Sequence, residues 1–150
     1  MDRMCSLQKA EMNELEEICA LPCTGDAGAR RNLYECAAGE KRLHVLRVNG
    51  EEAVVGAVAI SHEENAQSAR AMRLEGMAVS AGVHGAYEAM ISACELIAML
   101  RGQSVMVIAC PAEDEKLMAF CTRQGFAETG TCDGVKRFER GIEQGCHCGG

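Results

Sequence analysis

The sequence predicts an α/β (α+β) domain with one mixed, mostly antiparallel central sheet of six or seven strands and helices on both faces. Residues 105–109, VMVIA, form an unbroken apolar run that is typical of a strand buried on both faces. Asn49-Gly50 separates two apolar stretches and is the strongest short signal for a β-hairpin. A helical pattern at residues 87–100 lies between two strand patterns, which predicts a right-handed parallel crossover.

The composition is that of one domain with a substantial core. The chain has 150 residues, of which 48% are hydrophobic, so disorder over most of its length is excluded. Its formal net charge of −7 argues against nucleic acid as a partner and is compatible with an amine substrate. We find no apolar run of membrane-spanning length and no signal-peptide core, so we expect a cytoplasmic protein that does not associate with a membrane.

The first predicted elements are a short strand and two helices. Residues 2–7 form the strand, and residues 10–21 form a helix with one apolar stripe made of Met12, Leu15, Ile18 and Cys19. Pro22 and the following glycines predict a loop, and residues 29–38 predict a second short helix.

Three strands and the longest helix follow. Residues 43–48 and 53–60 flank the Asn49-Gly50 turn, and residues 61–68 are polar and predict a loop. Residues 71–79 form the next strand, in which Gly76 indicates a bulge or a close approach to the backbone. Apolar residues recur at helical spacing through residues 87–100, and Gly102 ends that helix.

The C-terminal part predicts strand, helix and hairpin. Pro111 ends the strand at residues 105–109, and acidic residues occupy the first turn of a helix that Gly125 terminates. Leu117, Phe120 and Cys121 share one face of this helix. Residues 126–131 and 135–140 then pair around an Asp133-Gly134 turn.

Ten cysteines are unusual in a chain of this length. Without an export signal, reduced thiols are expected rather than a disulfide framework. Six of the cysteines lie inside predicted elements, where they serve as small apolar residues: Cys5, Cys19, Cys36, Cys94, Cys110 and Cys121.

The C-terminal residues have little apolar content. Cys146-His147-Cys148 suits a soft metal ion, or else belongs to a solvated tail. Structural zinc sites usually carry two ligand pairs at wider spacings, which favours the solvated tail, so no metal is expected. We therefore expect a folded domain over residues 1–141 and a flexible tail containing Cys and His over residues 142–150.

The segment at residues 108–126, the opening LQKAEMNELEEICAL and the order of elements together resemble the GNAT acetyltransferases. The resemblance covers nearly the whole chain. It implies a GNAT-like acyl-CoA-binding domain and an acetyl-CoA-dependent N-acetyltransferase. Acetyl-CoA, or another acyl-CoA, would be the co-substrate, and the acceptor would be an amine of a small molecule or a peptide.

The resemblance also implies a cofactor site. The backbone of Met77, Ala78 and Val79 would bind the thioester and pantetheine as an added strand. The family's pyrophosphate loop falls on Gly82, Val83, His84, Gly85, Ala86 and Tyr87. Free amides at the start of a helix bind phosphates. The alternative is an ordinary strand-to-helix turn in which Gly82 and Gly85 supply positive φ angles.

Three further residues receive roles from the resemblance. Glu75 lies where many family members carry a general base, and its alternative is an exposed carboxylate paired with Arg73. Cys121 replaces the family's tyrosine and would be the general acid, or else packs in the core. Asp114 lies where the family often has an asparagine near the cofactor, or else caps the following helix.

Two other function classes stay open. A non-catalytic GNAT-like domain that binds a metabolite or protein partner would explain the missing tyrosine and the altered loop. A thiol-based metal or redox protein would explain the cysteines. A homodimer is compatible with either class.

Overall fold

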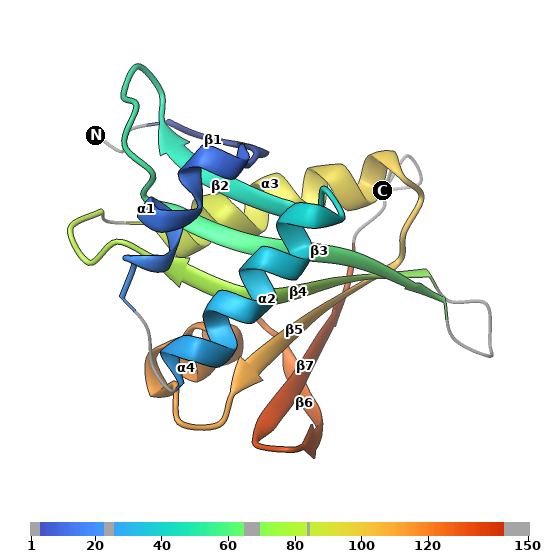
Figure 1. The fold of residues 1–150 in the computed structure, drawn as a ribbon. Coiled ribbons are helices and arrows are strands. Elements are labelled where there is room, and N and C mark those ends of the chain that lie inside the picture. The colour runs from blue at the N-terminus through green and yellow to red at the C-terminus, as the bar shows by residue number, and fades with distance from the viewer. Residues whose placement is uncertain (1–3, 23–25, 65–69, 84, 143–150) are drawn as a thin grey trace.

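The computed structural model describes residues 4–22, 26–64, 70–83 and 85–142, and it has one mixed seven-stranded sheet (Figure 1). The strand order is β1-β2-β3-β4-β5-β7-β6, in which β4 and β5 pair in parallel and every other pair is antiparallel. The strands are β1 (Cys5–Lys9), β2 (Leu43–Val48), β3 (Gly56–Glu64), β4 (Arg70–Val79), β5 (Val105–Pro111), β6 (Ala127–Cys132) and β7 (Val135–Gly141). The predicted fold class is confirmed.

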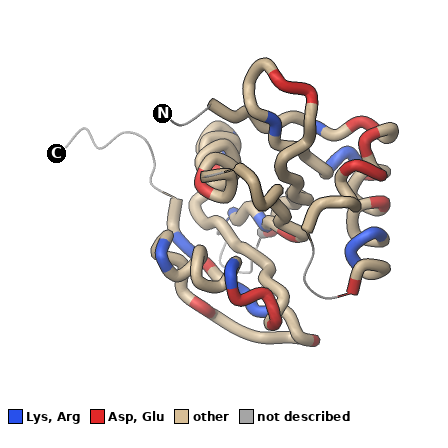
Figure 2. Tube along the Cα trace, turned by 90° about the vertical axis from the view of Figure 1, so that its left-hand side faces the viewer, with Lys and Arg blue, Asp and Glu red and all other residues tan. Residues whose placement is uncertain are grey.

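Helices cover both faces of the sheet. The helical segments are η1 (Met12–Glu14), α1 (Leu15–Cys19), α2 (Ala27–Gly39), α3 (Ala86–Leu100) and α4 (Glu115–Arg123). Helices α1 and α2 lie on one face, whereas α3 and α4 lie on the other, as the two perpendicular views show (Figures 1 and 2). Among the described residues, no helix is long and apolar enough to cross a membrane.

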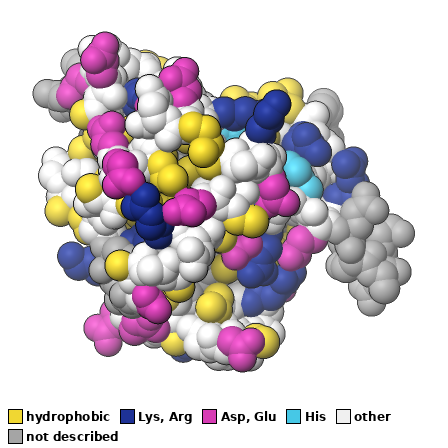
Figure 3. Space-filling view, in the orientation of Figure 1, with side chains coloured by type: hydrophobic (Ala, Val, Ile, Leu, Met, Phe, Trp, Pro, Cys, Tyr) yellow, Lys and Arg dark blue, Asp and Glu magenta, His cyan; other side chains and the backbone are white. Residues whose placement is uncertain are grey.

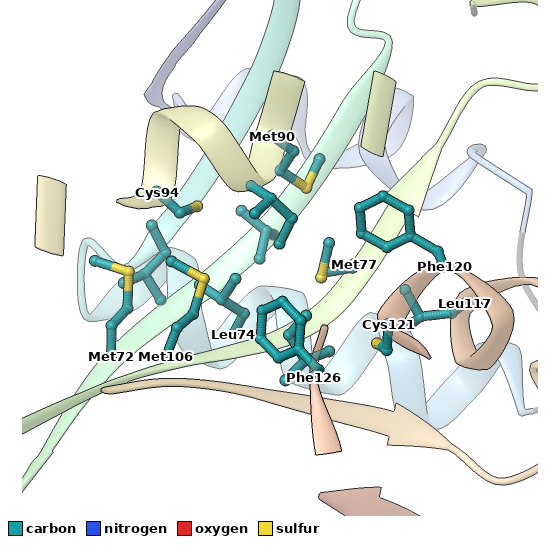
Figure 4. Close-up of a cluster of buried hydrophobic side chains, with 14 of the residues drawn as sticks. Met72, Leu74, Met77, Met90, Cys94, Met106, Leu117, Phe120, Cys121 and Phe126 are labelled. Carbon is teal, nitrogen blue, oxygen red and sulfur yellow. The ribbon is translucent and has the colours of Figure 1, made fainter. Parts of the chain in front are cut away.

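Each helical layer has its own hydrophobic core. The larger core lies between the sheet and α3 and α4, and is filled largely by methionine, cysteine and aliphatic side chains (Figure 4). The smaller core, which includes Ile18 and Tyr34, lies under α1 and α2. Flexible methionines and small thiols fill the space that aromatic rings occupy in other cores, which suits a chain with 3% aromatic residues.

Several predicted boundaries differ from the structure. Strand β1 begins at Cys5 rather than near residue 2, and β3 begins only at Gly56, so residues 49–55 form a longer connection than the Asn49-Gly50 signal predicts. Pro111 is the last residue of β5 and pairs with Val135 instead of ending the strand before it. Proline is tolerated there because it terminates a strand.

Three apolar residues are also placed differently than predicted. Met12 is exposed although the sequence predicts it on an apolar stripe, and Leu96, within the apolar pattern at residues 87–100, is exposed as well. Burial on α3 follows Met90, Cys94 and Ala98 instead. Ile142, predicted to belong to the tail, is buried in the larger core, and its N–H donates to the Ser104 carbonyl at 2.8 Å.

A β-bulge interrupts β4 at Gly76, as the sequence predicts. Ala57 of β3 pairs with Ala78, but Ala59 pairs with Glu75, so β4 contains one extra residue between these pairs. Gly76 accommodates the bulge because its φ of 63° lies in the left-handed region.

Two side chains of α2 bind the carbonyl groups of this bulge. The Tyr34 hydroxyl, fully buried, donates to the Gly76 carbonyl at 2.6 Å and accepts from Arg30 Nε at 3.0 Å. Arg30 Nη2 donates to the Met77 carbonyl at 3.2 Å. These bonds replace the ladder partners that the bulge removes, so α2 fixes the shape of β4.

Replacing Gly76 with alanine is expected to lower the free energy of unfolding by about 2 kcal/mol or more. The substitution imposes the left-handed conformation on a residue with a Cβ, and that Cβ would lie 2.9 Å from Leu33 Cδ2 and from Tyr34 Cε1. Chemical denaturation measures the change. Gly39→Ala is the control, since no atom lies within 4 Å of its added Cβ and its stability should change little. Equal stabilities of the two variants would contradict the role of the bulge.

Candidate active site between β4 and β5

The two parallel strands separate at their C-terminal ends. Their pairing runs from Ala71–Val105 to Leu74–Ile108 and stops there in the described part of the chain. Strand β4 remains paired with β3 as far as Val79, and β5 remains paired with β7 as far as Pro111. The sheet therefore opens between β4 and β5 after the fourth residue pair, and the diverging strand ends are visible in Figure 1.

The backbone of β4 offers hydrogen-bonding groups at this opening. The Ala78 carbonyl lies 3.2 Å from the position of an added Cβ on Gly56 of β3, so Ala78 directs its polar groups toward β3. Neighbouring residues of a strand direct theirs to opposite edges. Met77 and Val79 thus face the opening, although the Met77 carbonyl is already bound by Arg30.

Only two of the three backbone positions predicted to bind the cofactor lie at the opening. Val79 and the N–H of Met77 lie at the opening. Ala78 pairs with Ala57 and is buried, so it takes part in the sheet instead.

The N-terminus of α3 lies just beyond the end of β4. Gly85 is the N-cap residue with a φ of 75°, and no side chain caps the helix. Added Cβ atoms at Gly82 and Gly85 would contact no atom within 4 Å, so the backbone here is open. In the part of the chain that the structure describes, no side chain accepts from the first amides of α3, beginning at Ala86, as in a phosphate-binding helix start.

The alternative interpretation of this loop, an ordinary strand-to-helix turn with positive φ angles at Gly82 and Gly85, is only partly correct. Gly85 supplies a positive φ, but Gly82 does not. His84 lies outside the described residues. Glu88 is the acidic residue of the first turn of α3, and it is exposed.

Tyr87 turns away from the loop toward α4. Its ring stacks on Phe120 with centroids 5.1 Å apart. Burial raises the pKa of Tyr87 to about 12, and the charge of Asp114 adds to this effect, while Arg30 opposes it. The half-buried Tyr87 therefore contacts Phe120, the neighbour of Cys121, and Cys121 is the position at which the family carries its tyrosine.

Cys121 is a core residue in this structure. Its side chain is fully buried beside Phe120 in the larger core (Figure 4). Burial raises the pKa of the Cys121 thiol to about 12, with a further contribution from Asp114. Asp114 caps α4, since its carboxylate accepts from the Leu117 amide at 3.1 Å. Both alternatives, core packing for Cys121 and capping for Asp114, agree with these positions.

A groove follows the α2 side of the opening. One part has a volume of about 340 Å³ and the next about 500 Å³. Both are lined by Glu75, Ala109, Asp133 and Val135, so they are continuous. The groove runs from the N-terminal end of α2 along the end of β5 to the β6–β7 hairpin.

Glu75 lines this groove and is the end of a chain of ion pairs. Arg73 Nε donates to the Glu75 carboxylate at 3.1 Å, as the pairing alternative predicts. Arg73 also lies 3.7 Å from Glu63, which bonds Arg137 at 3.0 Å. The Glu75 carboxylate remains about one-third exposed and is held in place by the Arg73 guanidinium.

The charges at the inner end of the groove are mainly acidic. Among the described residues that line it, the carboxylates are those of Asp26, Glu75, Glu113 and Asp133, and the one cation is Arg30. The Arg30 guanidinium donates to Tyr34, to the Met77 carbonyl and to the Pro22 carbonyl. A cationic ligand is therefore favoured in this part of the groove.

Several solved structures with a similar fold are acetyltransferases. A GNAT-family acetyltransferase from Listeria monocytogenes has a TM-score of 0.68 at 14% identity, over 92% of this chain and 95% of that one. The PaiA N-acetyltransferase from Thermoplasma acidophilum, in complex with coenzyme A, has a TM-score of 0.71 at 10% identity, over 91% and 98%. Arabidopsis thaliana Naa50, in complex with the bisubstrate analogue CoA-Ac-MVNAL, has a TM-score of 0.61 at 15% identity, over 91% and 97%.

These similarities show that the chain has the fold of the GNAT acetyltransferases. No family model matches its sequence, and no curated protein matches it either.

Sequence reasoning missed two residues that shape the site. Tyr34 and Arg30 were placed in a short helix without a role, yet they bind the bulge of β4. Their signal was weak, since an Arg-x-x-x-Tyr spacing places both side chains on one helix face without indicating the strand they reach.

Alkylation of the folded protein with iodoacetamide at pH 8 is expected to modify the exposed Cys36 and Cys132 and to spare Cys94, Cys110 and Cys121. The thiolate is the reactive form, and burial raises the pKa of all three spared thiols to about 12. Peptide mapping by mass spectrometry reads the result, with a denatured sample as the control. Rapid modification of Cys121 in the folded protein would contradict its assignment to the core.

Proposed function

We propose that the chain is a GNAT-type N-acyltransferase that uses acetyl-CoA or a related acyl-CoA. The observation that carries this proposal is the opening between β4 and β5, flanked by the uncapped N-terminus of α3. At this opening β4 loses its hydrogen-bonding partners, and no other strand replaces them. An extended pantetheine chain can supply those hydrogen bonds. The CoA complex of the PaiA enzyme supports this proposal through its fold.

The amides at the start of α3 would hold the diphosphate of the cofactor. The open backbone at Gly82 and Gly85 allows close approach, and the helix dipole favours an anion. The thioester would then lie near Val79, between the two helical layers.

Glu75 is proposed to be the general base, directly or through a water molecule. The bound ammonium group first loses one proton to solvent, and the neutral amine nitrogen then attacks the thioester carbonyl carbon, so that a C–N bond forms and the C–S bond breaks. The proton lost by the nitrogen passes to the Glu75 carboxylate, and the thiolate leaves with the electron pair of the C–S bond. Glu75 lines both parts of the groove, so the acceptor amine can reach it from the α2 side.

The Cys121 thiol is a poor proton donor for the leaving thiolate. Proton transfer from a thiol with a pKa of about 12 to a thiolate whose conjugate acid has a pKa of about 8.5 is uphill by about 5 kcal/mol. Tyr87 has a similarly raised pKa but is only partly buried, so we assign it a hydrogen bond to the leaving sulfur rather than a full proton transfer. Solvent then protonates the departed thiolate.

The acceptor is proposed to be a cationic amine of a small molecule or a peptide. The four carboxylates at the inner end of the groove favour an ammonium group. The Naa50 complex contains the bisubstrate analogue CoA-Ac-MVNAL, which supports a peptide amine as an acceptor.

Saturating acetyl-CoA is expected to stabilise the protein by about 2.7 kcal/mol at one hundred times its dissociation constant. Thermal unfolding measures this effect. Gly85→Glu places a carboxylate on the phosphate loop and should abolish the stabilisation. Gly39→Glu introduces the same charge at the C-terminal end of α2 and should retain it. No stabilisation of the unmodified protein at millimolar acetyl-CoA would refute the proposal.

Glu75→Gln is expected to lower kcat about 10²-fold to 10⁴-fold, because it removes the proton acceptor and keeps the shape of the side chain. Acetylation of an amine panel, followed by release of free CoA thiol, provides the measurement. Glu63→Gln is the matched control, since Glu63 shares the Arg73 ion-pair chain but does not line the groove. Equal rates for the two variants would exclude Glu75 as the base.

A non-catalytic GNAT-like domain that binds a metabolite or a protein partner is the second candidate. The exposed Glu88 in the first turn of α3 favours it over a CoA-dependent enzyme, because its charge opposes a diphosphate at that helix start. No stabilisation by acetyl-CoA, or stabilisation without acetylation of any amine in the panel, would support this second function.

A further inference from the structure

A second pocket lies away from the proposed acyl-transfer site. It has a volume of about 180 Å³ and lies between the C-terminal end of α3 and the ends of β1, β2 and β3. Helix α3 has 15 residues and spans about 22 Å, with the proposed diphosphate site at one end and this pocket at the other. We call it the basic pocket, after its six ionisable lining residues: Lys9, Lys41, Arg42, His44, His62 and Arg101.

The charge of the basic pocket contrasts with that of the whole chain. Asp and Glu outnumber Lys and Arg by 22 to 15 in the sequence, yet the lining has four Lys or Arg residues and no carboxylate among the described residues. Figure 3 shows basic and histidine side chains gathered at the upper right of the molecule, near the start of β2 and the end of α3. Like charges that converge on one concavity repel one another unless an anion lies between them.

Three of these cations have no carboxylate of their own. Arg42 is paired with Glu40 at 2.6 Å and donates to the Ile60 carbonyl. Lys9, Lys41 and Arg101 form no ion pair within the described part of the chain. These three charges remain available to a ligand.

The two histidines are oriented by hydrogen bonds. Gln103, which is 1% exposed, binds His62 Nδ1 through its Nε2 at 2.8 Å and donates to the Ala71 carbonyl at 3.2 Å. Because the amide nitrogen donates to Nδ1, the neutral His62 ring carries its proton on Nε2, so His62 is a donor in either charge state. His44 Nδ1 donates to the Arg42 carbonyl at 3.0 Å.

Neighbouring cations act on both imidazole rings. Burial lowers the pKa of His62, and the charges of Arg101 and Arg70 lower it further. The pKa of His44 is also lowered, by burial first and then by Lys9, against its bond to the Arg42 carbonyl. Glu40 is the carboxylate that pairs with Arg42 of this pocket.

The backbone at Lys41 is strained in a way that glycine would relieve. Lys41 has a φ of 60°, in the left-handed region, directly after α2, where chains usually place glycine. The side chain at this position is exposed and lines the basic pocket. Residues in strained backbone conformations cluster at functional sites, which favours a functional role for the Lys41 side chain.

We propose that the basic pocket binds a phosphate group, either as inorganic phosphate or as the phosphate of a small phosphorylated metabolite. Ammonium and guanidinium groups of Lys9, Lys41 and Arg101 would pair with the oxygens, and His62 would donate a further hydrogen bond. Ile60 and Ile97 line the same pocket and suit a short carbon chain attached to the phosphate. This site does not depend on the proposed acyl transfer.

The test is titration of the full chain with inorganic phosphate and, separately, with glycerol 3-phosphate. Ionic strength is held constant with chloride, so that screening does not change. We expect saturable stabilisation at millimolar ligand and a shift of the His44 and His62 imidazole signals in ¹⁵N NMR spectra. Tighter binding of glycerol 3-phosphate identifies a metabolite as the ligand, and equal binding identifies the free anion.

Two variants make the test specific. Lys41→Gly should raise the melting temperature because it relieves the left-handed lysine, and yet weaken phosphate binding at least 10-fold. Arg123→Gln, which removes an exposed charge at the end of α4, should leave both properties unchanged. Gly85→Glu should also leave phosphate binding unchanged, which separates this site from the proposed diphosphate loop.

Unchanged phosphate affinity in Lys41→Gly would overturn the proposal, as would the absence of any shift in the two imidazole signals. Weakening by Gly85→Glu instead would assign the phosphate to the loop of α3 and overturn it as well.

Discussion

The left-handed bulge at Gly76 is the constraint on which the rest of the structure depends. Strand β4 must pair with β3 on one edge and leave β5 on the other, and an extra residue changes its direction at that point. The carbonyl groups that lose ladder partners there are bound by Tyr34 and Arg30, so helix α2 is attached to the bent segment. Helix α2 therefore holds the bent segment of β4 at the point where the sheet opens.

The opening joins two surfaces with different chemistry. On the α3 side are free helix amides and an open glycine backbone, which suit a diphosphate. On the α2 side is a groove whose inner end is acidic and contains the fixed carboxylate of Glu75, which suits an ammonium group. An acyl group held between β4 and β5 is accessible from both sides, so donor and acceptor can approach each other without sharing a pocket.

Local signals in the sequence predicted much of the fold and less of the site. Alternating and continuous apolar runs identify strands, and glycines at Gly76 and Gly85 mark special backbone geometry, because these effects act over a few residues. The partners of the bulge and the lining of the basic pocket come from segments as far apart as Lys9 and Arg101. No local pattern encodes such contacts. Cys121 was ambiguous because a thiol serves equally as a core residue or a proton donor, and only its burial separates the two.

A crystal structure of the protein with acetyl-CoA tests the central claim most directly. The account predicts that pantetheine lies between β4 and β5, hydrogen-bonded to the backbone of Val79, with the diphosphate at the first amides of α3. It also predicts that the thioester carbonyl carbon lies on the path between Val79 and Glu75. Acetyl-CoA bound elsewhere, or an opening closed by the protein's own side chains in its presence, would contradict the account.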